Sequence, residues 1–187
     1  MRDRVHAMLE RVDTEARAAL GDTAARRVRA ALAEALALRD AAINDDRDTR
    51  LLHPARTIRI LIADGACRSA DALAAAACLD TIDPALAPEP PPLLRPIVNA
   101  VPRADPGADD QLLEQIVTAD HDTALLALAE RLDHVRHLHL RRDLDPRPLH
   151  AQVREVYAPA ARRFSAQIAR RFDRWADAFE RRLVFPR

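Results

Sequence analysis

Three side chains on one predicted helix have the types and spacing of a chemical site. Glu130, His134 and His137 stand at positions i, i+4 and i+7 within residues 122–141, so they share one helix face. Asp133 can also reach His137 at the i, i+4 spacing. A column of carboxylate and imidazole groups suits a metal site or an acid–base pair, because both use groups that lose protons near neutral pH. Taken alone, a helix this rich in charge favours the alternative of an exposed, salt-bridged face.

Further candidates lie in residues 51–84. His53 stands directly before Pro54, where a lone histidine is either a helix-start residue or a ligand. Asp80 and Asp83 follow an alanine-rich segment that is predicted to be helical. Carboxylates at a helix C-terminus oppose the helix dipole, so another interaction is expected to hold them there. The residue pattern by itself leaves these side chains between a structural and a functional role.

The elements that must position these groups are predicted to be helices. Hydrophobic residues make up 49% of the chain, mostly alanine and leucine, whereas aromatic residues make up 3%, so closely packed helices are favoured over a β-sandwich. Pro54 suits the first turn of one helix, which Gly65 ends, and Ser69 suits the cap of the next. Apolar spacing predicts the other helices over residues 3–20, 23–43, 70–79, 109–118, 122–141 and 149–183. The 187 residues fit one all-α domain, a helical bundle over residues 1–187.

Two regions depart from regular helix. Eight prolines fall between Pro84 and Pro106, a density that no long helix survives. Residues 84–109 are therefore predicted to form an ordered or semi-ordered excursion, which is either a lid over the pocket or a spacer. The C-terminal helix over 149–183 is expected to be kinked or split near Pro159. One face of this helix is dense in arginine and poor in acids, which would suit an acidic partner, and the oligomeric state stays open.

The overall composition excludes several classes of function. The 29 basic residues, all arginine, balance 29 acidic residues, which argues against general binding to nucleic acid or to a membrane surface. With three glycines there is no glycine-rich phosphate loop, and Cys67 and Cys78 match neither a disulfide scaffold nor a zinc pattern. No apolar run suggests a signal peptide or membrane span, so a cytoplasmic location is expected. The expected partner is a small molecule or a nucleotide-like ligand.

Four blocks of the chain resemble, in order, the HD hydrolase domain of the RelA/SpoT family. The blocks are LLHPARTIRIL (51–61), ADALAAAACLDTID (70–83), the segment 109–138 that ends in LAERLDHVRHL, and REVYAPAARRF (154–164). The resemblance covers about residues 25–183 and implies an HD-like helical fold. The family's members degrade the alarmones (p)ppGpp. Because the synthetase part of the long members has no counterpart here, the chain most resembles the small, hydrolase-only members.

The resemblance also implies where a metal would lie. In the family, one Mn²⁺ is held by the histidine before proline, by a His-Asp pair and by a further aspartate. These positions fall on His53, Leu79, Asp80 and Glu130. Leucine cannot bind a metal, and the loss of one central ligand weakens such a site strongly. The resemblance therefore implies a cavity without the family's usual metal.

Other functional positions of the family are altered as well. The Glu-Asp pair that serves the attacking water falls on Asp83 and Pro84, and the asparagine that lines the nucleotide pocket falls on His134. The family's loop before the His-Pro pair contacts the base, and here it reads NDDRDTR (44–50). The candidate substrate-binding residues are Arg47, Arg50 and His137.

Three functions remain open. The favoured one is a repurposed, metal-independent enzyme without a cofactor, which moves protons on a small molecule through His53, Asp80, Asp83, Glu130 and His134. The first alternative is a (p)ppGpp or nucleotide pyrophosphohydrolase whose altered Mn site consists of His53, Asp80 and Glu130. The second alternative is a non-catalytic pseudo-hydrolase that binds a ligand or regulates a partner. It predicts that apolar side chains fill the pocket, with Leu79 packed and His53 paired internally.

Overall fold

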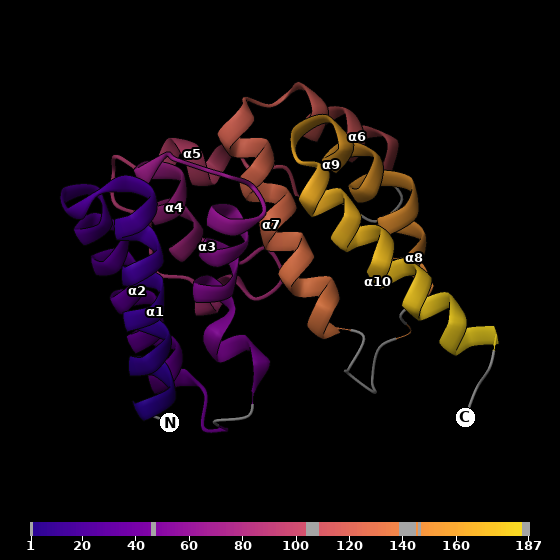
Figure 1. The fold of residues 1–187 in the computed structure, drawn as a ribbon. Coiled ribbons are helices and arrows are strands. Elements are labelled where there is room, and N and C mark those ends of the chain that lie inside the picture. Colours follow the sequence, from indigo (N-terminus) through magenta and orange to yellow (C-terminus); the bar gives the residue numbers. More distant parts are fainter. Residues whose placement is uncertain (1, 46–47, 104–108, 139–144, 146, 185–187) are drawn as a thin grey trace.

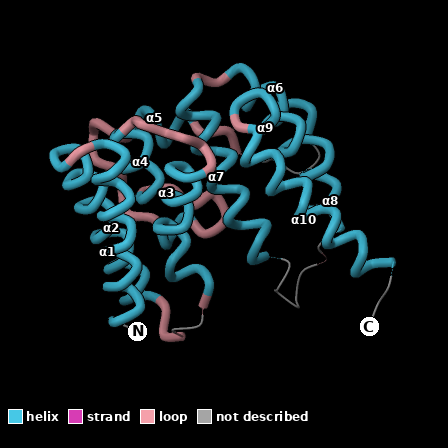
Figure 2. Tube along the Cα trace, in the orientation of Figure 1, coloured by secondary structure: helices cyan, strands magenta, loops and turns pink. Residues whose placement is uncertain are grey.

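The computed structural model describes residues 2–45, 48–103, 109–138, 145 and 147–184. Within these ranges the chain forms helices joined by turns and loops, and it contains no strand (Figure 2). The predicted all-α class is therefore confirmed. The assignment of the whole chain to one HD-like domain stays a prediction. No described helix is both long and apolar enough to cross a membrane.

The first two helices form a hairpin that covers one side of the molecule (Figure 1). Helix α1 (Arg2–Leu20) and helix α2 (Asp22–Ala42) are separated by a single residue, Gly21. Gly21 has a φ of 79°, a left-handed conformation that glycine adopts without the penalty a side chain would bring. Its N–H donates to the Arg17 carbonyl at 2.9 Å, which closes the end of α1. The hairpin packs mainly on α3 and α4.

Helix α3 (His53–Ala63) follows a 3₁₀ turn, η1 (Thr49–Leu52). Pro54 lies in the first turn of α3, as predicted, where its missing N–H costs no hydrogen bond. After α3 the chain needs a glycine at position 65, because a Cβ there would lie 2.8 Å from the Leu61 carbonyl oxygen. The start of α3 places His53 at the inner end of the helix bundle, where it is buried.

Helix α4 (Ala70–Ala77) is the short alanine-rich helix at the centre of the N-terminal half. Ser69 caps it as predicted, since the serine side chain accepts from Ala72 N–H at 3.2 Å. Residues 72–77 are all buried, and α4 contacts α2, α3, α5 and α7. Small side chains allow this many close neighbours. The helix ends before the predicted limit of residue 79, so the next residues lie in a loop that turns into the core.

The proline-rich region contains a 3₁₀ turn, η2 (Pro84–Leu86), and one short helix, α5 (Arg95–Ala100). Helix α5 packs on α4 and α7 and buries Val98. None of residues 84–103 lines the pocket described below. Residues 104–108 lie outside the described residues.

Helix α6 (Asp109–Thr118) leads into α7 (His121–Leu138), which lies between the N-terminal helices and the C-terminal ones (Figure 1). Helix α7 packs on α3, α4, α9 and α10, and every residue from 123 to 135 is buried. The alternative of an exposed, salt-bridged face is therefore wrong for Glu130, Asp133 and His134. Neighbouring helices surround α7, so its charged groups must find partners inside the protein.

The C-terminal region is divided into more pieces than predicted. Helix α8 (Arg147–Gln152) continues into a π-helical turn, η3 (Val153–Tyr157), and then into α9 (Ala158–Phe164) and α10 (Ala166–Val184). The irregular π-helical turn ends at Tyr157, two residues before Pro159, so the helical run changes its hydrogen-bond pattern near the proline, where a break was expected.

A further break, which the sequence did not predict, falls at Ser165, which is extended, with φ −151° and ψ 112°. The Ser165 hydroxyl donates to the Asp64 carbonyl at 2.6 Å and accepts from Ile168 N–H at 3.2 Å, so it caps α10 and ties it to the end of α3.

Candidate functional site

Four ionisable side chains meet in the core. They are His53 at the start of α3, Asp80 in the loop after α4, and Glu130 and His134 on α7. One nitrogen or oxygen atom from each lies within 4.8 Å of those of the others, and all four residues are buried. The packing of α3 and α4 on α7 brings these residues together. Four of the five predicted catalytic residues therefore share one site, the buried cluster.

Leu79 does not contribute to the buried cluster, although it precedes Asp80. It is 2% exposed and belongs to the hydrophobic core. The second imidazole of the cluster comes instead from His134, which lies one helical turn along α7 from Glu130. The two histidines of the cluster thus stand on different helices.

Asp80 is held by a buried arginine that the sequence did not single out. Arg39 Nη2 donates to Asp80 Oδ2 at 2.7 Å, and both side chains are at most 1% exposed. The other oxygen, Oδ1, accepts the N–H groups of Ile82 and Asp83 at 3.1 and 2.8 Å. Burial opposes the charge on Asp80, but contacts with His134 and Arg39 hold the pKa of this carboxyl well below its usual range. Asp80 is therefore ionised and already bonded through both oxygens.

His134 is a charged histidine between two carboxylates. Its Nε2 lies 2.9 Å from Glu130 Oε1 and 3.3 Å from Asp80 Oδ1. Neither contact has the geometry of a hydrogen bond, so Nε2 interacts with the two oxygens through its charge. Burial disfavours the charged ring, but the two carboxylates outweigh it and raise the pKa of His134 to about 9.

Glu130 is the nearer of the two carboxylates beside the charged His134 ring. Against the effect of burial, the contact with His134 lowers the pKa of Glu130 to about 2. Glu130 also accepts from Thr81, both from N–H at 2.9 Å and from Oγ1 at 2.7 Å. Near pH 7 the cluster therefore holds an imidazolium–carboxylate pair.

His53 has the opposite character to His134. Its Nδ1 lies 2.9 Å from Asp133 Oδ2, and Arg56 donates to both oxygens of Asp133, at 2.7 and 2.8 Å. Despite its burial, Asp133 has a pKa well below its usual range because His53 and Arg56 donate to it. An ionised carboxylate only accepts, so His53 Nδ1 is the donor and Nε2 of the neutral ring carries the lone pair.

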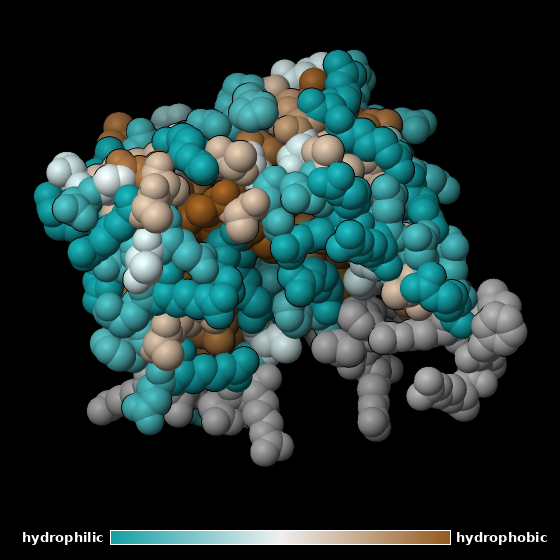
Figure 3. All heavy atoms as spheres, viewed as in Figure 1, coloured by the Kyte–Doolittle hydropathy of each residue, from teal (hydrophilic) through white to brown (hydrophobic). Residues whose placement is uncertain are grey.

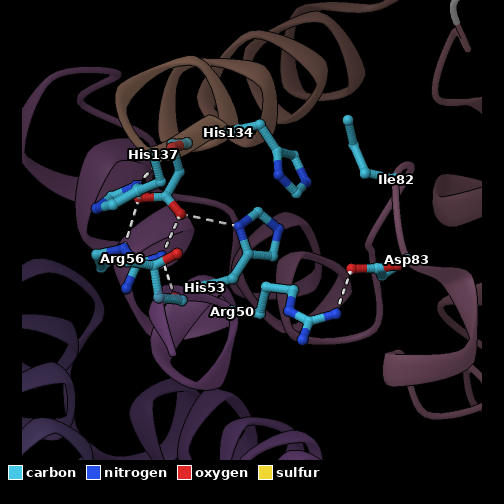
Figure 4. Close-up of a pocket in the computed structure, with 9 residues that line it drawn as sticks. Arg50, His53, Arg56, Ile82, Asp83, His134 and His137 are labelled. Carbon is cyan, nitrogen blue, oxygen red and sulfur yellow. Dashed lines mark hydrogen bonds and ion pairs between the residues drawn. The ribbon is translucent and has the colours of Figure 1, made fainter. Parts of the chain in front are cut away.

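The free nitrogen of His53 is buried. Nε2 has no hydrogen-bond partner among the described residues. Burial lowers the pKa of His53; the hydrogen bond to Asp133 opposes this shift, and the charge of His134 adds to it. The rings of His53 and His134 stack with their centroids 4.2 Å apart and their planes 27° from parallel (Figure 4). A neutral and a protonated imidazole are thus in direct contact.

The two histidines line a small pocket with a cavity volume of about 40 Å³ (Figure 4). Its wall consists of Thr49, Arg50, His53, Arg56, Ile82, Asp83, Asp133, His134 and His137. With His134 protonated, this wall holds three cations (Arg50, Arg56 and His134) and two carboxylates (Asp83 and Asp133), a net charge of +1. We therefore call it the histidine pocket and expect it to favour a small anion.

The remaining predicted residues have separate positions. Asp83 lies in the pocket wall, where it pairs with Arg50 at 3.2 Å, but not in the buried cluster. His137 also lines the pocket, and its Nδ1 donates to the Asp133 carbonyl at 2.7 Å. Arg47 lies outside the described residues.

The sequence missed several functional side chains. They are Arg39, Arg56, Thr81 and, as a partner of His53, Asp133. The spacing of Asp133 on its helix was a signal that it could act in a site. Nothing in the sequence distinguished Arg39 and Arg56 from the other arginines, because the chain contains so many of them.

The chain matches no protein-family model, no curated protein and no solved structure. The resemblance to the RelA/SpoT-type HD family therefore rests on the four sequence blocks alone.

Proposed function

We propose that this protein is a metal-independent acid–base enzyme that acts on a small anionic molecule in the histidine pocket. The observation that supports this proposal best is the stacked pair His53 and His134, whose pKa values are shifted in opposite directions in one pocket. Paired groups whose environments push their pKa values apart are the usual way in which proteins assign an acid and a base. A cytoplasmic location is part of this proposal.

His53 is the proposed base. Asp133 fixes the tautomer, so that Nε2 is free to take a proton from the substrate or from an attacking water. His134 is the proposed acid. An imidazolium carries N–H on both nitrogens, so Nε2 can face Glu130 and Asp80 while Nδ1–H is available to a leaving group. After one turnover His53 has gained a proton and His134 has lost one, and exchange with water restores both.

The charges around the two histidines support a site that works without a metal. Asp80, Glu130 and Asp133 carry three negative charges, and Arg39, Arg56 and protonated His134 carry three positive ones. Buried charges are costly unless they are paired, and here each carboxylate already has a cationic partner. These six charges therefore sum to zero when His134 is protonated.

The first experiment measures the two histidines directly. In a pH titration followed by NMR, we expect one imidazole to titrate near pH 9 and one below the ordinary value of 6.5. The variants His134→Gln and His53→Gln assign the two signals. Two imidazoles that both titrate near 6.5 would contradict the proposal.

The second experiment tests activity. Phosphorylated and carboxylated metabolites, including (p)ppGpp, are incubated with the protein in the presence of a chelator. We expect turnover of a small anion that His53→Ala and Glu130→Gln each abolish and that His121→Ala leaves intact. Turnover that survives the first two substitutions would rule out this mechanism.

A metal-dependent pyrophosphohydrolase is the second candidate, because four buried donor atoms lie within 4.8 Å of one another and His53 Nε2 has no partner. Imidazole and carboxylate are donors that Mn²⁺ accepts, so His53, Asp80, Glu130 and His134 would hold the ion. A bound Mn²⁺ would supply Lewis-acid activation of a phosphate. The bonds from Arg39 and two backbone N–H groups to Asp80 count against it. Stoichiometric metal in protein purified without chelator, with activity lost on its removal, would favour this candidate.

A non-catalytic ligand-binding protein is the third candidate. It predicted that Leu79 is packed and that His53 is paired internally, and both are observed. However, the histidine pocket is open and is lined by charged groups as well as by Ile82. Tight binding of an anion with no turnover in the activity screen would favour this candidate over the first.

A further inference from the structure

A second pocket lies between α7 and α10, on residues that the proposed reaction does not use. Its wall is made of Arg136 on α7 and of Arg171, Arg174 and Trp175 on α10. Its volume is about 320 Å³, and it is open to solvent. No carboxylate lines it, and it shares no lining residue with the histidine pocket. We call it the arginine groove.

The positive charge of the arginine groove is only partly neutralised. Arg171 pairs with Asp64 at 3.0 Å, whereas no acid pairs with Arg136 or Arg174 among the described residues. By contrast, Arg154 and Arg162, which lie nearby on η3 and α9, pair with acids on α10. Hydrophilic residues dominate the surface over α10 in Figure 3. Within that surface the groove concentrates cations that lack a counter-charge.

Trp175 gives the arginine groove a flat, apolar side. The indole stacks on Phe179 with ring centroids 5.5 Å apart and planes 9° from parallel, and it also contacts the ring of His150 at 6.2 Å. These contacts hold the indole in one orientation. Aromatic rings held in this way stack nucleic-acid bases, while arginine guanidinium groups bind phosphate in a fork geometry.

We propose that the arginine groove binds a nucleoside polyphosphate, with its phosphates on Arg136, Arg171 and Arg174 and its base on Trp175. The size of the groove lies in the range of small-molecule sites. Three arginines beside one aromatic ring in the same groove match a ligand that has several negative charges at one end and a flat ring at the other. An inorganic polyanion would use only the arginines, and an apolar ligand only the tryptophan.

The test uses Trp175 as the reporter, because it is the single tryptophan of the chain. Intrinsic fluorescence of the full chain is followed during titration with a nucleoside triphosphate, with inorganic tripolyphosphate and with the free nucleoside. We expect a saturable change with the triphosphate, an affinity about tenfold lower for tripolyphosphate because stacking is lost, and still weaker binding of the nucleoside. Added salt should weaken binding of the triphosphate.

Matched variants locate the site. Arg136→Gln with Arg174→Gln should lower the affinity for the triphosphate at least tenfold, since two charge-assisted contacts are removed. Arg163→Gln with Arg181→Gln changes the net charge equally, but at exposed arginines outside the groove, and should leave the affinity within about twofold. Circular dichroism checks that both double variants are folded.

Three results would overturn the proposal. Equal affinities for the triphosphate and for tripolyphosphate would show a plain polyanion site. Equal losses in the two double variants would show non-specific attraction by charge. No response to the triphosphate, with a clear response to RNA or to an acidic peptide, would identify the groove as a surface for a macromolecule.

Discussion

The buried pair of Arg39 and Asp80 allows the most direct test of the site. Both side chains are at most 1% exposed, and their atoms Nη2 and Oδ2 are 2.7 Å apart. Breaking a buried ion pair by removing one partner costs about 3–5 kcal/mol, because the remaining charge stays buried without compensation. Asp80 would keep two backbone N–H donors and the nearby charge of His134, which favours the lower end. We therefore expect Arg39→Met to lower the free energy of unfolding by about 3 kcal/mol.

Urea denaturation measures this loss, which would be a large part of the 5–15 kcal/mol that domains typically have. Arg162→Met is the matched control, because Arg162 pairs with Asp173 at 2.9 Å but is 56% exposed, and exposed pairs contribute about 0–1 kcal/mol. The double variant Arg39→Met with Asp80→Asn removes both charges and should regain about 2 kcal/mol relative to the sum of the single losses. A loss for Arg39→Met as small as that for Arg162→Met would refute the view that this pair anchors the cluster.

Three further predictions concern the surroundings of the site. Leu79→Ala should cost about 2–4 kcal/mol in urea denaturation because it empties packed core, whereas Leu93→Ala, at a side chain that is 65% exposed, should change stability by less than about 0.5 kcal/mol; equal effects would contradict the buried position of Leu79. The pKa of His134 is raised from 6.5 to about 9, so its charge stabilises the fold fully below about pH 6.5, and up to about 3 kcal/mol is lost as the pH rises through 9. His134→Gln should flatten this decline between about pH 7 and pH 10, and an unchanged slope would show that another group titrates. Ser165→Ala should cost about 1 kcal/mol, seen as a lower melting temperature, because it removes the cap of α10 and the bond to the end of α3; an unchanged melting temperature would mean that the cap is dispensable.

Local rules explain which parts of the fold were predictable. Gly21 ends a helix, Pro54 starts one and Ser69 caps another through contacts within a few residues. The break at Ser165 escaped prediction because it depends on a bond to the Asp64 carbonyl, 101 residues away. Pro159 gave a local signal, and the irregular π-helical turn does lie directly before it.

The candidate site was also predictable only in the part that depends on local spacing. Glu130 and His134 had to be neighbours once their helix formed, because four residues make about one turn. Whether their face met water or the core was undetermined, since a charged helix face is the same in sequence in either case. The packing of α7 among the surrounding helices decided it, and burial then turned ordinary ion pairs into strongly shifted pKa values.

The sequence by itself determined the all-α class, most helix ends and the set of side chains that could take part in acid–base or metal chemistry. The tertiary structure alone decided their pairing. Asp133 meets His53 across 80 residues, and Arg39 meets Asp80 across 41. The residues next to Arg39 in the sequence do not indicate that it, among 29 basic residues, would pair with Asp80. The physical reason is that helix formation depends on contacts within a turn or two, whereas the identity of acid, base and counter-ion depends on burial and on distances that exist only after the helices have packed.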